Sequence, residues 1–241
     1  MKREELEKYI LQTHDIITSY MHPGETLQRS PGASASAVCE APAGYGTAQK
    51  SDDVQKLLRQ MPSGNYTIED YEQIPDERRV ELIDGVIYDM SAPTTLHQQI
   101  AGEVYFQLKQ YFRGGKGPCV PFISPVDVEL GKDKKTILQP DVLIVCDKNK
   151  IGQKRIYGAP DWILEVISPS TSQKDYIIKT VKYMTENVRE YWLIDPKIKK
   201  VIVYNLEGDE GPQIHDLKGK LPTGIYQGDL TIDLDEITQL F

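Results

Sequence analysis

The sequence predicts an α/β fold, a sandwich with a mixed central β-sheet flanked by helices, which a helical extension precedes. Two apolar runs of strand length, each interrupted or bounded by proline, lie within residues 139–145 and 160–169. Such runs are typical of strands that are covered on both faces. The predicted order of elements, helix, three strands, helix, strand, indicates an α/β sandwich with a mixed central sheet.

The first 62 residues differ in composition from the rest of the chain. Apolar residues recur with helical spacing up to about residue 20 and again over 54–61, while the stretch 23–50 is rich in Gly, Ala, Ser and Pro. We interpret residues 1–62 as a helical extension with a flexible linker, and residues 63–241 as the main domain. The extension is either a docking or oligomerisation arm or a helical segment that packs on the domain.

The main domain is expected to begin with a short helix and a hairpin. Thr67 precedes Asp70 by three residues, the spacing of a helix cap. Residues 80–90 then contain Asp84-Gly85 between apolar residues, and this dipeptide is a common two-residue turn between antiparallel strands.

The middle of the chain alternates between helix and strand. An apolar residue at every third or fourth position predicts a helix over 93–112. Strands are predicted over 119–130 and 137–146, with a polar turn at 131–135 between them.

The last third of the chain completes the pattern. After the apolar run 162–167, the polar residues 168–175 offer several caps for a helix that continues to about residue 187. Two further strands are predicted over 190–194 and 201–206, and the short alternating pieces after residue 208 are expected to form edge strands.

Composition limits the class of protein. The 241 residues are 39% hydrophobic and 27% charged, enough for one sizeable domain with an appendage or for two small domains. The net charge of -8 argues against binding nucleic acid through overall basicity, although a local basic groove or a metal-mediated contact with phosphates remains open. No apolar run is long enough to span a membrane, and the charged N-terminus lacks the apolar core of a signal peptide.

The number and spacing of the cysteines indicate the redox environment of the protein. Cys39, Cys119 and Cys146 are too few and too scattered for a disulfide framework or a zinc site. The sequence therefore predicts free thiols, a reducing environment and a cytoplasmic location.

Two predicted strands each carry an acid in an unfavourable setting. Glu165 lies inside the apolar run 162–167, where an ionised carboxylate costs several kcal/mol unless it is paired or bound to a metal. Asp141 opens the preceding strand. Two carboxylates on neighbouring buried strands suit a hard divalent cation such as Mg²⁺. The alternative is structural, with Glu165 paired to a buried lysine or arginine.

Two more residues are candidates for the same place. Glu81 alternates with apolar Val80 and Leu82 on the hairpin strand, so its side chain faces either the cleft or solvent. Lys179 follows Asp175 by four residues, the spacing of an ordinary surface pair worth a few tenths of a kcal/mol. Spacing alone would leave Lys179 at the surface.

Five segments together resemble the Uma2 family, bacterial proteins described as putative restriction endonucleases within the PD-(D/E)xK nuclease superfamily. They are ELIDG (81–85), QPDV (139–142), GAPDWILEVISPST (158–171), the stretch 175–183, and VREYWLIDP (188–196). The resemblance covers about residues 66–206 and does not extend to residues 1–62. It implies a restriction-endonuclease-like fold for residues 63–241 and an endonuclease that acts on DNA.

The resemblance also implies roles for single residues. Asp141 and Glu165 become the metal-holding acids, and Glu81 becomes a further acid of the site. The superfamily's usual lysine would fall at position 167, where this chain has Ile167. A lysine on the following helix stands in for it in this family, which assigns Lys179.

Two neighbours of the site are implied by the same resemblance. His97 lies where the family often has a histidine, although a histidine on a helix face is more often structural. Gln139 either lines the cleft or only forms hydrogen bonds at the end of its strand.

The implied cofactor is Mg²⁺, with Mn²⁺ as an alternative. Asp141 and Glu165 would hold an ion that lowers the pKa of a bound water and neutralises charge on the phosphate. Lys179 would orient or help deprotonate that water, or stabilise the transition state. Glu81 would complete the coordination sphere or hold a second ion.

Partners and an alternative function complete the expectations. Cutting both strands of a duplex is simplest with two paired sites, which favours a homodimer. The alternative to an active nuclease is a catalytically weak module that keeps the nuclease fold for binding or regulation, as the acidic net charge and Ile167 suggest.

Overall fold

The computed structural model describes residues 62–168, 175–207 and 211–241, and all structural statements refer to these residues. The predicted extension over 1–62 lies outside them except for residue 62. Within the described ranges, no helix is long and apolar enough to cross a membrane.

The larger of the two main sheets is six-stranded, with the strand order β11-β10-β9-β8-β6-β3. Its strands are β3 (Val120–Ile123), β6 (Val142–Val145), β8 (Trp162–Val166), β9 (Glu190–Asp195), β10 (Lys200–Asn205) and β11 (Gln213–Asp216). The pair β8 and β9 is parallel and the other pairs are antiparallel, so the predicted mixed sheet is confirmed.

The smaller main sheet is five-stranded, with the order β2-β1-β5-β4-β7. Its strands are β1 (Val80–Ile83), β2 (Val86–Asp89), β4 (Val128–Leu130), β5 (Thr136–Leu138) and β7 (Ile156–Tyr157). A separate hairpin consists of β12 (Lys220–Pro222) and β13 (Thr231–Asp233).

The helices differ greatly in length. The longest is α4 (Thr95–Arg113), and a π-helical turn, η2 (Asp175–Lys179), continues directly into α6 (Thr180–Thr185). The short ones are α3 (Ile68–Tyr71), α7 (Leu234–Thr238) and the 3₁₀ turns η1 (Lys148–Lys150) and η3 (Gly224–Tyr226). The predicted cap of the first helix is confirmed, because the side chains of Thr67 and Asp70 form a reciprocal capping box.

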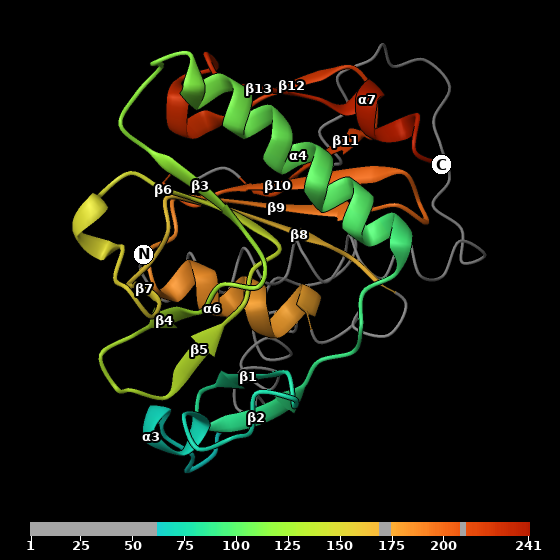
Figure 1. Cartoon of the computed structure of the whole chain (residues 1–241). Helices are drawn as coiled ribbons and strands as arrows, with labels where there is room; N and C mark the ends of the chain where they lie inside the picture. The colour runs from blue at the N-terminus through green and yellow to red at the C-terminus, as the bar shows by residue number, and fades with distance from the viewer. Residues whose placement is uncertain (1–61, 169–174, 208–210) are drawn as a thin grey trace, which may run out of the picture.

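The six-stranded sheet is covered on both faces (Figure 1). On one face its alternate residues pack against α4, the β12–β13 hairpin and α7, in a cluster that includes Val104, Trp162 and Trp192. On the other face they pack against α6 and the five-stranded sheet, in a cluster that includes Tyr183 and Leu143. Burial on both faces explains why the central strands β6 and β8 are predominantly apolar runs.

The hairpin turn has the geometry that its sequence predicts. Asp84 and Gly85 have φ angles of 48° and 79°, the left-handed region that a two-residue turn of type I′ requires. A side chain at position 85 would also collide with the backbone of Gly64, since a Cβ there would lie 2.3 Å from the Gly64 carbonyl oxygen.

Two predicted strands are wrong in their extent. The stretch 119–130 forms β3 and β4, which belong to different sheets, and the stretch 137–146 likewise divides into β5 and β6. Pro125 and Pro140 lie at the two breaks, and proline has no N–H to donate to a β-ladder. Each break therefore lets one apolar stretch pass from one sheet to the other.

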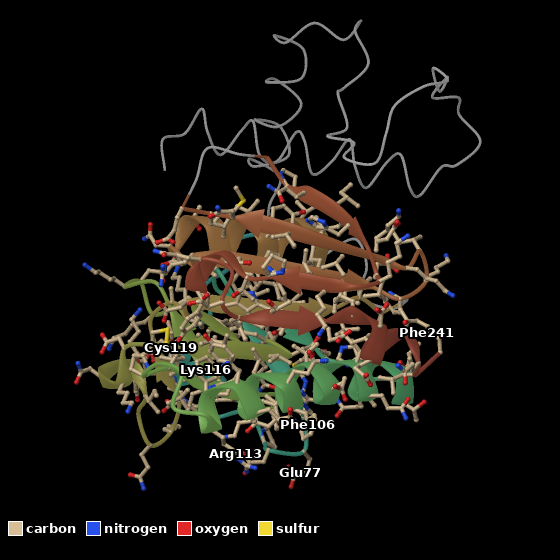
Figure 2. The ribbon with its side chains drawn as sticks, turned by 90° about the horizontal axis from the view of Figure 1, so that it is seen from above. Glu77, Phe106, Arg113, Lys116, Cys119 and Phe241 are labelled. Atoms are coloured by element: carbon tan, nitrogen blue, oxygen red, sulfur yellow. A yellow bond between two sulfur atoms is a disulfide. The ribbon has the colours of Figure 1, made fainter. Side chains whose placement is uncertain are left out.

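The prediction of free thiols is wrong for two of the three cysteines. Cys119 and Cys146 form a disulfide, and Cys39 lies outside the described residues. Val120 pairs with Val145 across β3 and β6, so the next positions outward face each other despite a separation of 27 residues in sequence. Cys119 lies beyond the end of α4, near Lys116 (Figure 2). The cytoplasmic location stays a prediction.

One acid lies inside the core at the start of β9. Glu190 is 2% exposed and accepts hydrogen bonds from Trp192 Nε1 at 2.6 Å and from the backbone N–H of Ile225 at 2.9 Å. Burial raises the pKa of Glu190, and these hydrogen bonds oppose the rise only in part. Glu190 therefore ties β9 to the turn η3.

Removing the disulfide should lower the free energy of unfolding by roughly 3–4 kcal/mol, because the bridge restricts the unfolded chain over a long loop. The double variant Cys119→Ala/Cys146→Ala and the reduced wild type should agree in urea titrations. Cys39→Ala serves as the control and should not change the response to reductant. Three reactive thiols in unfolded, non-reduced wild type would contradict the bridge.

Glu190 should make stability depend on pH in a defined direction. Its pKa is higher in the folded than in the unfolded protein, so folding binds a proton between the ordinary value of 4.5 and the raised folded value. The stability of the wild type relative to Glu190→Gln should therefore decrease as pH rises through that interval. Urea titrations of both proteins at several pH values measure the difference, and a difference that grows with pH would contradict the assignment.

Candidate active site

Asp141 and Glu165 face each other across neighbouring strands. In the antiparallel pair of β6 and β8, Val142 pairs with Leu164, so the next position outward places Asp141 opposite Glu165. The backbone N–H of Val166 donates to Asp141 Oδ2 at 2.8 Å, which fixes the aspartate against β8. The structure thus brings together the two acids that the sequence predicts as a pair.

Glu165 is buried and has two close side-chain donors. It is 5% exposed, and its Oε1 accepts from Lys179 Nζ at 3.0 Å and from the hydroxyl of Tyr183 at 2.8 Å. Burial, and then the nearby charge of Glu165, raise the pKa of Tyr183 well above its ordinary value. Tyr183 therefore stays protonated and donates its hydrogen to the glutamate.

Glu81 faces the interior. It lies on β1, is 5% exposed, and its Oε1 is 3.0 Å from Lys179 Nζ. The backbone N–H of Gln139 donates to the same oxygen at 2.9 Å. Of the two orientations left open by the sequence, the structure shows the buried one, next to the other acids.

Lys179 joins the two sheets. It is 4% exposed, ends the π-helical turn η2, and lies between Glu81 of the five-stranded sheet and Glu165 of the six-stranded sheet. The surface position that spacing alone suggested is wrong. The helix that carries Lys179 packs over the sheet, and a sequence offset of four residues does not reveal which face a helix buries.

His97 lies against Asp141. Its Nε2 is 3.0 Å from Asp141 Oδ2, and Thr94 caps the helix by accepting from the backbone N–H of His97. The imidazole thus belongs to the site. Its Nδ1 is buried without a hydrogen-bond partner in the described part of the chain.

Gln139 forms hydrogen bonds through both its backbone and its side chain. In addition to its backbone bond to Glu81, its side chain accepts from Arg79 Nη2 at 3.1 Å and donates to Asp127 Oδ1 at 2.9 Å. The hydroxyl of Tyr71 also donates to Asp127 Oδ1, at 3.1 Å. Burial raises the pKa of Tyr71 to about 12, so this hydroxyl remains a donor. Hydrogen bonds to Glu81, Arg79 and Asp127 therefore fix Gln139 beside the acids.

A second buried lysine lies on the same helix. Lys182 Nζ is 2.7 Å from Asp84 and 3.0 Å from Glu186. Burial lowers the pKa of Lys182, but its hydrogen bonds to Asp84 and Glu186 outweigh this effect and leave the pKa above its ordinary value. Lys182 connects α6 to the hairpin turn and does not contact the acids of the site.

The donor atoms fit a hard divalent cation in their chemistry. Carboxylate oxygens are the ligands that Mg²⁺ takes in proteins, and no hydrogen bond from a described residue reaches Asp141 Oδ1 or Glu81 Oε2. Among the described residues, no three Asp, Glu, His or Cys side chains already stand together as a metal site. Lys179 occupies the space between Glu81 and Glu165, so binding of a metal ion there requires this ammonium group to shift.

Sequence reasoning missed two residues of this region. Tyr183 follows Lys179 by four residues, and that helical spacing was the available signal that both approach Glu165. Arg79 precedes Glu81 by two residues, the period of a strand, and this spacing signals a shared face.

Comparisons with known proteins show the family and the fold. The sequence profile of the Uma2 family, described as "Putative restriction endonuclease", matches residues 68–229. The crystal structure of a putative nuclease belonging to DUF820 from Anabaena variabilis ATCC 29413 has a TM-score of 0.61 at 20% sequence identity, over 73% of this chain and 99% of that one. This likeness confirms the nuclease-like fold. No match was found among curated proteins.

Removing Lys179 should destabilise the protein strongly, because two buried carboxylates lose their shared counter-charge. We expect Lys179→Met to lower the free energy of unfolding by about 3–5 kcal/mol in EDTA, as measured by urea titration. Lys182→Met is the matched control on the same helix. Its loss should be smaller, because the carboxylates that it leaves are more exposed. Equal losses in the two variants would contradict the central position of Lys179.

Proposed function

The chain belongs to the Uma2 family, and from this membership and the buried acid cluster we propose that it is an endonuclease that hydrolyses phosphodiester bonds of DNA with a divalent metal ion. Mg²⁺ is the proposed ion and Mn²⁺ the alternative. The proposed site consists of Asp141, Glu165 and Glu81 as the acids and Lys179 as the cation.

The observation that supports this function most is that two buried glutamates share one ammonium group next to a third acid. Glu81 and Glu165 each lie 3.0 Å from Lys179, and Asp141 lies opposite Glu165 across β6 and β8. A purely structural buried ion pair would be balanced, because an uncompensated buried charge costs several kcal/mol. Buried carboxylates that share one ammonium group suit a divalent cation, and this favours the metal site over the alternative in which Glu165 has only a structural lysine partner.

Each residue has a part that its position suggests. Asp141 and Glu165 would hold the ion, Asp141 through Oδ1, which accepts no hydrogen bond from a described residue, and Glu81 would complete the set of oxygen ligands. When bound, the ion lowers the pKa of a coordinated water and neutralises charge on the phosphate. Lys179 would stabilise negative charge on the phosphate or orient the attacking water.

Three neighbours would hold Asp141 and Glu165 in place. His97 and the backbone of Val166 fix Asp141, and Tyr183 fixes Glu165 through its Oε1. Residues that orient metal-binding groups in this way typically affect metal affinity about ten- to a hundredfold.

A catalytically weak module that binds or regulates is the second candidate. Ile167 occupies the position of the usual superfamily lysine, and Lys179 already stands between two of the acids. In this alternative the ion pairs would be the permanent state, and the fold would serve for binding.

Cleavage of supercoiled plasmid and of single-stranded DNA with Mg²⁺ or Mn²⁺ distinguishes the two functions. We expect wild type to nick DNA, and Asp141→Asn, Glu165→Gln and Lys179→Ala each to lower the rate by at least about a hundredfold, since each removes a group that holds the ion or stabilises charge. Glu236→Gln, an exposed acid on α7, is the control and should cleave like wild type.

The contrary result has a clear form. Wild type that binds Mg²⁺ and DNA without cutting either substrate would reject the active enzyme and favour the binding module. Equal cleavage by wild type and all three site variants would point to a contaminating nuclease.

A further inference from the structure

An exposed cation lies beside the acid cluster. Arg79 directly precedes β1, and the backbone N–H of Met90 donates to its carbonyl oxygen at 3.0 Å, which extends the ladder of β1 and β2 by one pair. Because side chains alternate along a strand, Arg79 and Glu81 lie on the same side of the small sheet. Arg79 is an exposed residue, whereas Glu81 is buried.

A neutral residue holds this guanidinium in place. Arg79 Nη2 donates to Gln139 Oε1 at 3.1 Å, and Gln139 is itself fixed by its bonds to Glu81 and Asp127. Gln139 also lies two residues before Asp141 in the chain. Gln139 therefore positions both Arg79 and the start of β6, where Asp141, a proposed metal ligand, is located.

Arg79 differs from Arg78 and Lys182 in having no acidic partner among the residues that the structure describes. Arg78 forms a two-pronged ion pair with Asp89, at 2.7 and 3.0 Å, and Lys182 is held by two carboxylates. Among the described residues, no carboxylate lies within 4.0 Å of the Arg79 guanidinium. One of its donors binds Gln139, and the others remain available.

These available donors suit one kind of ligand. A guanidinium presents its N–H groups as a planar fork that matches two oxygens of a phosphate, and it keeps its positive charge at any ordinary pH. A site with three acids repels a DNA backbone, so a cation that Gln139 holds beside these acids has a clear use.

We propose that Arg79 binds a backbone phosphate of the DNA strand next to the phosphate that is cleaved. This inference rests on the proposed nuclease function and assigns a substrate contact to it. Arg79 is placed outside the metal-binding set because it is exposed at the rim, while Glu81, Glu165 and Lys179 are buried. Its role is to bind and align the substrate.

Binding of a fluorescent duplex of about 20 base pairs, measured by anisotropy in EDTA at several salt concentrations, tests the contact. Arg79→Ala should weaken binding about tenfold, and the slope of log K against log[NaCl] should become shallower by about 0.9, the value for one lost phosphate contact. Arg79→Lys retains the charge and should retain the slope. Arg78→Ala is the matched control, because it removes the adjacent arginine that is paired with Asp89, and it should bind like wild type.

Cleavage kinetics supply a second readout. Arg79→Ala should raise KM for the plasmid about tenfold and leave kcat within about twofold, because the contact is made equally in the bound substrate and in the transition state. A purely structural role through Gln139 would instead lower kcat in Arg79→Ala and in Arg79→Lys alike.

The outcomes separate this inference from the proposed function. Wild type that cuts DNA, with Arg79→Ala equal to it in affinity, salt slope and KM, would overturn the role of Arg79 and leave the nuclease intact. The role of Arg79 would also be overturned if Arg79→Ala and Arg79→Lys lost DNA affinity to the same extent and both had a lower melting temperature than wild type. Wild type that neither binds nor cuts DNA would remove both proposals.

Discussion

A single buried ammonium group connects the two sheets of this protein. Lys179 contacts Glu81 of the five-stranded sheet and Glu165 of the six-stranded sheet, each at 3.0 Å. Two buried carboxylates on opposite layers would repel each other and lose their hydration, and a cation between them offsets this cost. The helix α6 begins directly after Lys179, and its residues Tyr183 and Met184 pack in the core between the same layers.

The rest of the site depends on how the large sheet is covered. Because α4 packs on one face and α6 with the small sheet on the other, the central strand β6 is buried along its length, and the residues just beyond its ends are partly exposed. Asp141 lies at such an end, where the first turn of α4 brings His97 to within 3.0 Å of it. The acids therefore meet at the edge of a rigid core, which suits a site that must hold its groups in fixed geometry.

The proposed site combines buried charged residues with exposed ones. Glu81, Glu165 and Lys179 are each about 5% exposed or less, while Asp141 is partly open and Arg79 is exposed. Electrostatic interactions are strongest where water is excluded, as around the buried acids. A DNA strand, by contrast, reaches only the exposed residues of the site. A buried cluster that holds an ion and an exposed guanidinium that holds a phosphate are thus complementary parts of one proposed site.

The sequence by itself determined the features that depend on local chemistry. The apolar runs predicted strands buried on both faces, Asp84-Gly85 predicted the hairpin turn, and an acid inside such a run predicted the pair of Glu165 with Asp141. Family resemblance, and no local pattern, selected Lys179.

Only the tertiary structure decided the features that depend on long-range pairing. The register of β3 against β6 placed Cys119 beside Cys146, and proline breaks sent halves of two apolar stretches into different sheets. The burial of Glu81 and Lys179, and the exposure of Arg79 next to them, likewise arose when the sheets and α6 packed together. Local sequence determines the period of an element, but the face that it buries depends on neighbours distant in the chain.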